Sequence, residues 1–354
     1  MARELTEEQV REALKGVRYP GFSRDIVSFG LVKEVVVEEG RDVRVRISVA
    51  TRDPQTPQQL YRDCREALQG LEGVGKIDLD FDIREPEQTG AAAGGTTLQL
   101  AIPGVRSVVA VASGKGGVGK STVAVNLAVA LRREGLRVGL CDCDLYGPSV
   151  AHMSGSRERP GATEDNRIIP IVRHGLQLIS MGFLVEDSSP VIVRGPMATR
   201  YTQQFLRQVV WDDLDMLLLD LPPGTGDIQL TIVQTVALDG AVIVTTPQEV
   251  ALIDARKAVA MFEKVNVRVL GIVENMSYFQ CPSDGKRYFL FGEKGGAREA
   301  QRLGVPLLGE VPLEMETRER SDAGEPVALD DPQRSGMSAV FRNIAAQVRS
   351  AVGI

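Results

Sequence analysis

Two different spacings of apolar residues divide the chain into two parts. In the first part, apolar residues alternate with charged ones or recur at helical spacing, which predicts strands at 31–37, 43–49 and 74–81 and helices at 6–17 and 56–68. This α-β-β-α-β order predicts a small α+β domain over residues 1–84. Residues 85–103 follow with a small and polar composition that cannot form a core, so we expect a flexible linker there.

The second part, residues 104–354, alternates short apolar segments with helical ones. The apolar segments predict strands near 107–112, 137–142, 177–181, 215–220, 240–246, 268–273 and 306–311. Strands that are apolar on both sides and separated by helices indicate an α/β fold, with a mostly parallel sheet covered by helices on both faces. In such sheets, ligands bind at the carboxyl ends of the strands.

The segment Ser113–Thr122, SGKGGVGKST, lies between a predicted strand and a predicted helix. Its Gly-x-x-x-x-Gly-Lys-Ser spacing is the pattern of a phosphate-binding loop (P-loop). Four residues lack a Cβ atom, so that backbone N–H groups can turn toward phosphate oxygens: Gly114, Gly116, Gly117 and Gly119. We expect Lys120 to contact the β- and γ-phosphates of ATP and the Ser121 hydroxyl to bind Mg²⁺. The predicted nucleotide-binding residues run without a break from Gly114 through Val118 to Thr122.

Acidic residues end two more of the predicted strands. Asp142 and Asp144 are two residues apart, and period-two geometry directs both carboxylates to the same side. One of them can orient the attacking water or hold a water of the Mg²⁺ shell, although both can also belong to a plain strand-end turn. Asp220 ends the apolar run 217–220 in the manner of a Walker B aspartate, whose carboxylate faces Mg²⁺.

The segment Leu221–Asp227, LPPGTGD, follows Asp220 directly. Its prolines force the chain away from the strand, while Gly224 and Gly226 leave backbone N–H groups free to approach a γ-phosphate. It is a candidate switch loop. The alternative is a stiff connection with Asp227 as the N-cap of the next helix.

The length, composition and net charge of the chain limit the functions that it can have. The chain has 354 residues, of which 43% are hydrophobic, and a formal charge of −6, which argues against nonspecific nucleic-acid binding. No signal peptide or membrane-length apolar run is evident, so we expect a cytoplasmic protein with no membrane partner. Its four cysteines are too scattered for a disulfide framework.

Several motifs give the chain a specific resemblance. Lys115 looks like the signature lysine of deviant Walker A ATPases, and the chain resembles the Mrp/ApbC iron-sulfur cluster carriers in Asp142–Ser149, Arg194–Met197, Asp220–Gln229, Thr246–Gln248 and Glu274–Ser277. The resemblance runs over about residues 104–330. More loosely, Asp25–Val32 and Leu71–Val74 resemble the small iron-sulfur assembly domain that precedes such ATPases.

The resemblance implies a Mg²⁺-dependent ATPase that works as a homodimer and delivers iron-sulfur clusters to apoproteins, with assembly proteins as partners. It also implies that Lys115 reaches the partner subunit's phosphates, that Asp144 assists hydrolysis together with Lys115 and Lys120, and that Asn275 reads the adenine edge. On physical grounds, Lys115 would be a second cation beside the triphosphate, and such a cation stabilises the charge that develops during hydrolysis. Asn275 can equally be a plain turn residue.

The chain departs from the family at the expected cluster site. The family has Cys-x-x-Cys after its Asn-Met-Ser segment, whereas this chain has Cys281 followed by Asp284. Two subunits would then supply two thiolates to a bridging cluster, where common clusters take four. Carboxylate oxygen is a hard donor that matches sulfide-bridged iron poorly. Either Asp284 helps to hold a labile cluster, or the site has lost this role.

The remaining cysteines do not offer a replacement site. Cys141, Cys143 and Cys64 have the sequence context of packing residues, and none lies near 220–227, where an electron-transfer protein like nitrogenase iron protein would need one. The small domain also lacks the family's cysteine after Thr-x-Pro. A second function class is an ATP-driven positioning scaffold of the ParA/MinD kind without a metal cargo. Such proteins often end in a membrane-seeking helix, but we expect residues 340–354 to pack on the core.

Overall fold

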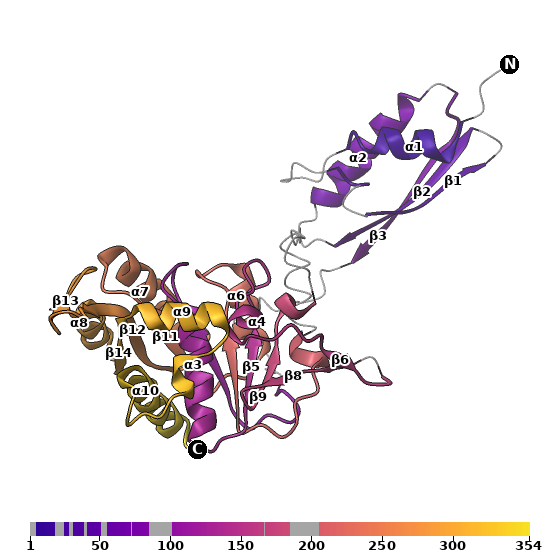
Figure 1. Cartoon of the computed structure of the whole chain (residues 1–354). Coiled ribbons are helices and arrows are strands. Elements are labelled where there is room, and N and C mark those ends of the chain that lie inside the picture. The colour runs from indigo at the N-terminus through magenta and orange to yellow at the C-terminus, as the bar shows by residue number, and fades with distance from the viewer. Residues whose placement is uncertain are drawn as a thin grey trace. The chain divides into compact units, whose positions relative to one another are not determined.

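The computed structural model divides the chain into two compact units, Met1–Thr96 and Thr97–Ile354 (Figure 1). The boundary falls inside the predicted linker. The structure describes residues 5–17, 25–27, 31–38, 41–50, 55–71, 73–84, 101–165, 167–184 and 205–354. Most of the predicted linker and the Arg194–Met197 motif lie outside these ranges.

The first unit is a three-stranded sheet with two helices on one face. Its elements are α1 (Glu7–Leu14), β1 (Val32–Glu38), β2 (Asp42–Ala50), α2 (Gln55–Gln69) and β3 (Ile77–Arg84). β1 pairs antiparallel with β2, and β2 pairs parallel with β3. The parallel pair needs a crossover connection, which α2 provides. Alternate residues of β2, from Val43 to Val49, are buried against the helices. The predicted α-β-β-α-β order is confirmed.

The second unit is built on a nine-stranded sheet. Along the sheet the strands lie in the order β13-β12-β11-β4-β10-β5-β9-β8, with β14 beside β12. Their bounds are β4 (Val108–Ala112), β5 (Val138–Asp142), β8 (Ile171–Arg173), β9 (Leu176–Ile179), β10 (Met216–Asp220), β11 (Gly240–Thr245), β12 (Val269–Gln280), β13 (Arg287–Tyr288) and β14 (Leu307–Leu313). All seven predicted strands are present and pair in parallel with one another. At the margins of this sheet, the short strands β8 and β13 pair antiparallel with β9 and β12.

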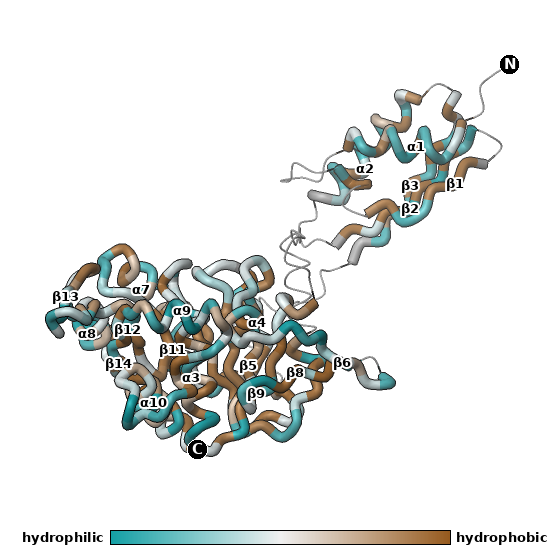
Figure 2. Tube along the Cα trace, in the orientation of Figure 1, coloured by the Kyte–Doolittle hydropathy of each residue, from teal (hydrophilic) through white to brown (hydrophobic). Residues whose placement is uncertain are grey.

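Helices cover both faces of this sheet, which confirms the predicted fold class. They are α3 (Lys120–Arg133), α4 (Val150–Met153), α6 (Asp227–Thr235), α7 (Glu249–Lys264), α8 (Gly295–Leu303), α9 (Met315–Ala323) and α10 (Gly336–Val352). Successive sheet residues point to opposite faces, so Val109 and Val111 belong to the core under α3 and α10, whereas Ala110 and Ala112 belong to the core under α6, α7 and α8. The apolar strands run through the middle of the unit in Figure 2.

Two helices pack deeply against the sheet of the second unit. α3 is buried on almost every side from Val123 to Leu131, including Asn126. α10 buries Phe341, Ile344 and Val348 in the core beside α3, which confirms the prediction that residues 340–354 pack on the core. A small two-stranded sheet of β6 (Gly161–Ala162) and β7 (Ile168–Ile169) lies apart from the main one. No helix in the described ranges is long and apolar enough to cross a membrane.

The register of the central strands positions the site. Asp220 at the end of β10 is level with Asp142 on β5 and with Val111 on β4, two residues before Ser113. The carboxyl ends of parallel strands lie at the same edge of the sheet. The loop Ser113–Thr122, the acidic pair Asp142 and Asp144, and Asp220 therefore meet at this edge.

Candidate active site

The loop Ser113–Thr122 lines a cavity of about 220 Å³ at the carboxyl edge of the sheet. The loop connects β4 to α3, and Gly119 occupies the N-cap position with a φ of 79°. The positive end of the α3 dipole therefore points into the cavity, as in anion-binding helix termini. Besides the loop, Asp144, Ser149, Met153 and Pro223 line the cavity.

The glycines of the loop divide into two groups. A Cβ atom on Gly114 would lie 2.1 Å from the backbone carbonyl of Asp254, and one on Gly119 would lie 2.2 Å from the side-chain nitrogen of Asn275. These two glycines let the protein pack closely against the loop. Around Gly116 and Gly117, in contrast, no described atom comes within 4 Å of such a Cβ. Their backbone is open to a ligand.

Lys120 is buried in this structure and forms an ion pair with Asp220. Its Nζ contacts Oδ1 of Asp220 and lies 3.2 Å from the Ser121 hydroxyl. Lys120 is 6% exposed and Asp220 is fully buried. Burial raises the pKa of Asp220, and the Lys120 charge acts in the opposite direction. Removing either partner would leave a buried charge without compensation.

The residues present fit a divalent cation of the magnesium type. Oδ2 of Asp220 is buried and has no hydrogen-bond partner within the described ranges. A free carboxylate oxygen beside the Ser121 hydroxyl is the hard oxygen donor set that Mg²⁺ prefers. Both predicted Mg²⁺ residues, Ser121 and Asp220, are therefore brought together.

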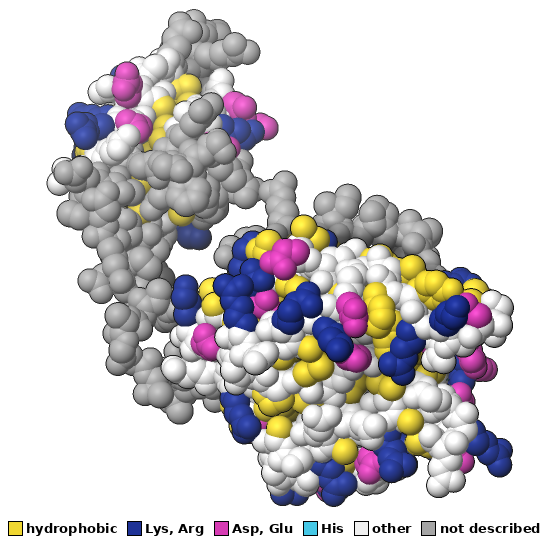
Figure 3. All heavy atoms as spheres, turned by 90° about the vertical axis from the view of Figure 1, so that its left-hand side faces the viewer, with side chains coloured by type: hydrophobic (Ala, Val, Ile, Leu, Met, Phe, Trp, Pro, Cys, Tyr) yellow, Lys and Arg dark blue, Asp and Glu magenta, His cyan; other side chains and the backbone are white. Residues whose placement is uncertain are grey.

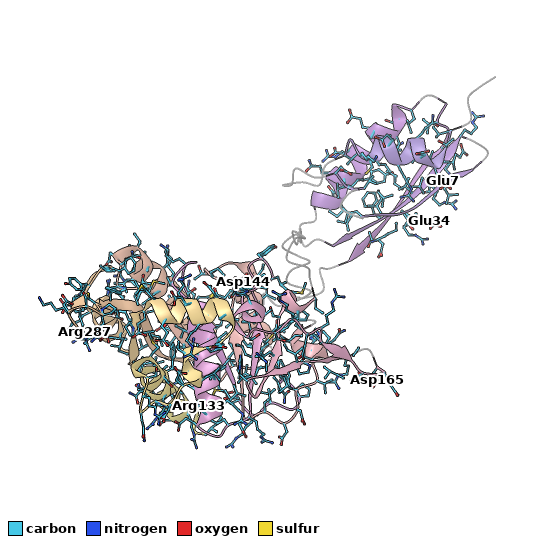
Figure 4. The ribbon with its side chains drawn as sticks, viewed as in Figure 1. Glu7, Glu34, Arg133, Asp144, Asp165 and Arg287 are labelled. Carbon is cyan, nitrogen blue, oxygen red and sulfur yellow. The ribbon has the colours of Figure 1, made fainter. Side chains whose placement is uncertain are left out.

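Asp142 and Asp144 lie differently from the prediction. β5 ends at Asp142, so the period-two geometry does not extend to Asp144. Asp144 lines the cavity, and its Oδ1 accepts the N–H groups of Tyr146 and Gly147 at 3.3 and 3.1 Å. Figure 4 places Asp144 at the carboxyl edge of the sheet and Arg133, the last residue of α3, at the opposite edge.

Asp142 is buried beneath the loop that carries Asp144. Its carboxylate accepts the N–H of Asp144 at 3.1 Å, the N–H of Ser149 at 3.1 Å and the Ser180 hydroxyl at 2.9 Å. Burial and the negative charge of Asp220 raise the pKa of Asp142 to about 7. Asp142 thus fixes the loop 144–150, a function that the sequence pattern missed because Ser180 is 38 residues away.

The segment Leu221–Asp227 contacts the phosphate-binding loop through its backbone. The N–H of Gly224 donates to the Ser113 carbonyl at 2.9 Å, and Gly224 has a φ of 97°. α6 begins at Asp227 with Gly226 at the N-cap position, so the expected N-cap is displaced by one residue. Lys115 also lines the cavity, and no hydrogen bond or ion pair of its ammonium group is found in the described part of the chain.

Asn275 contacts the loop rather than a turn of its own. Its side-chain nitrogen donates to the Val118 carbonyl at 2.9 Å, and the residue lies within β12, which rules out the plain-turn alternative. The preceding residue, Glu274, is buried and accepts the N–H of Gly296 at the start of α8. Together these two residues tie the β12 strand to the phosphate loop and to α8.

Cys281 lies at the tip of a hairpin formed by β12 and β13. Its Sγ is 3.0 Å from the Ser283 hydroxyl. Asp284 accepts the N–H of Lys286 and the hydroxyl of Tyr288, both at 2.9 Å, and these bonds hold its pKa below the usual range. Within the ranges that the structure describes, no group of three metal-ligating side chains is found. One chain therefore presents one thiol and one carboxylate at this hairpin.

The other cysteines are core residues, as predicted. Cys64 is fully buried in the first unit, and burial raises its pKa to about 12. Cys141 and Cys143 are buried with their sulfurs 3.8 Å apart on the face of the sheet toward α6 and α7.

A phosphate-binding loop on a parallel sheet, with a buried aspartate aimed at its lysine, defines the class of P-loop NTPases. The chain belongs to the family of NUBPL iron-transfer P-loop NTPases, whose profile matches residues 104–349. A second profile, iron-sulfur cluster assembly protein, matches residues 7–79.

Similar proteins agree with this assignment. An iron-sulfur cluster carrier protein of Deinococcus radiodurans is 47% identical over 95% of this chain and 94% of its own. An iron-sulfur cluster carrier protein of Synechocystis is 41% identical over 98% of this chain and 99% of its own. Among solved structures, a nucleotide-binding protein of Archaeoglobus fulgidus in complex with ADP is 38% identical, with a TM-score of 0.58, over 64% of this chain and 90% of that one.

The burial of the cysteines predicts a simple pattern of thiol reactivity. In the native protein we expect one thiol, Cys281, to react with a thiol reagent at neutral pH. Cys64, Cys141 and Cys143 should react only after denaturation, because the reagent cannot reach a buried thiol. Timed alkylation followed by peptide mass spectrometry measures this, with Cys281→Ala as the control that should show no fast phase. Rapid labelling of Cys64 would contradict the structure of the first unit.

Proposed function

We propose that the protein is a Mg²⁺-dependent ATPase that carries iron-sulfur clusters to apoproteins as a nucleotide-switched homodimer in the cytoplasm. The observation that carries the proposal is the meeting of the loop Ser113–Thr122 with Asp144 at one cavity, with Asp220 buried against Lys120, in a chain whose family transfers iron. Apoprotein clients and iron-sulfur assembly proteins would be its partners.

The phosphates of ATP would bind to the open backbone of Gly116 and Gly117, at the N-terminus of α3. Lys120 would turn from Asp220 to the β- and γ-phosphates, and Asp220 with Ser121 would hold Mg²⁺. The ion, when bound, neutralises phosphate charge during transfer. Asn275, already in contact with the loop, would be available to the adenine edge.

Hydrolysis would depend on Asp144. Phosphoryl transfer relies on positioning and electrostatics, and a carboxylate at the cavity wall can orient the attacking water. The bonds from Tyr146 and Gly147 hold this carboxylate in place. The loop 221–227, bonded to Ser113 through Gly224, would respond to the presence of the γ-phosphate.

The second subunit would complete the site through Lys115. Its ammonium group lies at an open cavity, which allows it to reach a neighbouring molecule's phosphates. Exposed apolar side chains that a partner subunit can cover lie on α7 and on the β13 hairpin: Val250, Ile253, Tyr288, Phe289 and Leu290. Figure 3 shows apolar and charged side chains mixed on the face that carries β13 and α8.

The cargo would be held between two copies of Cys281. This is the most exposed of the four cysteines and lies on a hairpin, where it can meet its counterpart. Asp284, held anionic by its hydrogen bonds, would serve as a weak oxygen ligand. A cluster with two thiolates and two carboxylates is expected to be labile, which suits a carrier.

The domain organisation would serve this function. A small domain over 1–84, joined by a linker over 85–103 to an ATPase domain over 104–354, could dock assembly proteins while the ATPase domain cycles. The scaffold alternative has less support, because α10 buries Phe341, Ile344 and Val348 in the core and so offers no apolar face to a membrane.

Replacing Asp144 by asparagine tests the hydrolytic site. Asn keeps the oxygen that accepts the loop N–H groups but removes the charge, so we expect kcat to fall by about 100-fold or more while nucleotide affinity changes little. Steady-state ATPase assays and calorimetry measure the two effects. The control is Asp165→Asn on an exposed turn, which should behave as wild type (Figure 4). Full activity of Asp144→Asn would remove Asp144 from the mechanism.

Anaerobic reconstitution with iron and sulfide tests the cargo site. We expect wild type to bind iron with visible absorption that fades on chelation, Cys281→Ala to bind none, and Asp284→Cys to hold a more persistent cluster, because thiolate is the better ligand. Iron stoichiometry and absorption spectra are the measurements. If wild type and Cys281→Ala are equally colourless while Asp284→Cys gains a cluster, this chain does not carry clusters at the hairpin.

A further inference from the structure

A second cavity, of about 550 Å³, lies on the far side of α4 from the nucleotide site. α4, the segment 155–159, the turn 182–184 and the end of α9 surround it. Among the residues that line it are Ala151, His152, Gly155, Arg157, Leu184 and Asp322. None of them has a role in the proposed ATPase reaction.

The floor of this cavity is fixed by close backbone packing. A Cβ atom on Gly155 would lie 3.0 Å from the Gly324 carbonyl, and one on Gly324 would lie 2.1 Å from the Gly155 Cα, so these glycines bring the ends of α4 and α9 together. The Nε2 of His174 lies 3.0 Å from the Ser154 carbonyl and 3.1 Å from that of Gly324, and donates to both. The cavity is therefore a preformed feature of the fold.

The walls combine positive charge with apolar surface. His152 and Arg157 are exposed, and no side-chain partner of either is found in the described ranges. Asp322 also lines the cavity, and its carboxylate is already paired with Arg318 at 2.9 Å. Leu184 is 43% exposed beside the buried ring of Phe183. A ligand that fits these walls carries carboxylates, which arginine binds in bidentate fashion. It also carries apolar groups, which can contact Leu184.

α4 connects this cavity to the nucleotide site. It has a single turn, with Ser149 and Met153 facing the nucleotide cavity and Ala151 and His152 facing the second cavity. Asp142 holds the start of the helix through the N–H groups of Ser149 and Val150. A ligand that shifts α4 on one side must therefore change the wall of the cavity on the other side.

We propose that this second cavity binds an acidic, partly apolar peptide segment of a partner protein, and that its occupancy is coupled to nucleotide binding through α4. Coupling of this kind is reciprocal, so the nucleotide changes peptide affinity by the same factor as the peptide changes nucleotide affinity. The inference concerns a second ligand and does not require that the protein carry a cluster.

Fluorescence anisotropy with a labelled hexapeptide of alternating glutamate and leucine tests the site on the full chain. We expect saturable binding with a Kd below about 1 mM, no binding of the lysine-leucine counterpart, and at least about tenfold weaker binding by Arg157→Glu. Arg302→Glu, on the exposed side of α8, is the matched control and should bind as wild type. Hydrogen exchange should show peptide-dependent protection over residues 150–159.

A non-hydrolysable ATP analogue should change the Kd of the peptide by about fivefold or more. An unchanged Kd would overturn the coupling. Absence of saturable binding, equal binding by Arg157→Glu and wild type, or complete displacement by millimolar inorganic phosphate would overturn the peptide site itself. These outcomes are independent of ATPase activity and of cluster content, so they are distinct from failure of the proposed function.

Discussion

The buried ion pair between Lys120 and Asp220 is the interaction on which the site depends. It exists because β4 and β10 are parallel neighbours, so the first residue of α3 and the last residue of β10 meet inside the sheet edge. Each charge compensates the other in a place where an isolated charge would be costly. Asp142 lies beside them, and its raised pKa reflects both this burial and the charge of Asp220. Under the proposed function, nucleotide binding would exchange the ion pair of Lys120 with Asp220 for one with the phosphates.

Close approaches at glycines and hydrogen bonds help to hold the loops around this pair. Gly114 lies against α7, Gly119 lies against Asn275, and Gly224 bonds to Ser113. A Cβ atom at Gly114 or Gly119 would clash with the neighbouring segment, and loss of the hydrogen bond would release Gly224. The two loops are consequently joined to each other and to β12, which continues to the hairpin of Cys281. Covalent and hydrogen-bonded contacts therefore connect the phosphate-binding loop to the hairpin that we propose as the cargo site.

Local patterns in the sequence predicted most of the fold and the position of the phosphate-binding loop. The apolar segments predicted the parallel strands, and the spacing of Lys120 and Ser121 after a strand predicted the site, because both signals are local. Asp142 was misjudged because its partners include Ser180, far along the chain, and because its strand ends before Asp144. The second cavity has no local signal at all, since its floor joins His174 to the end of α9. What the sequence could not supply is contact between segments that are distant in the chain.

The most direct test of the central claim is the Mg²⁺ dependence of nucleotide binding. Calorimetry with a non-hydrolysable ATP analogue, with Mg²⁺ or with a chelator, is carried out on wild type and on Asp220→Asn. If the nucleotide takes Lys120 from Asp220, wild type without Mg²⁺ is left with a bare buried carboxylate, so Mg²⁺ should tighten binding by about tenfold or more. In Asp220→Asn no charge is stranded, so binding without Mg²⁺ should be tighter than in wild type and the Mg²⁺ effect should largely vanish. An equal Mg²⁺ effect in both proteins would contradict the account.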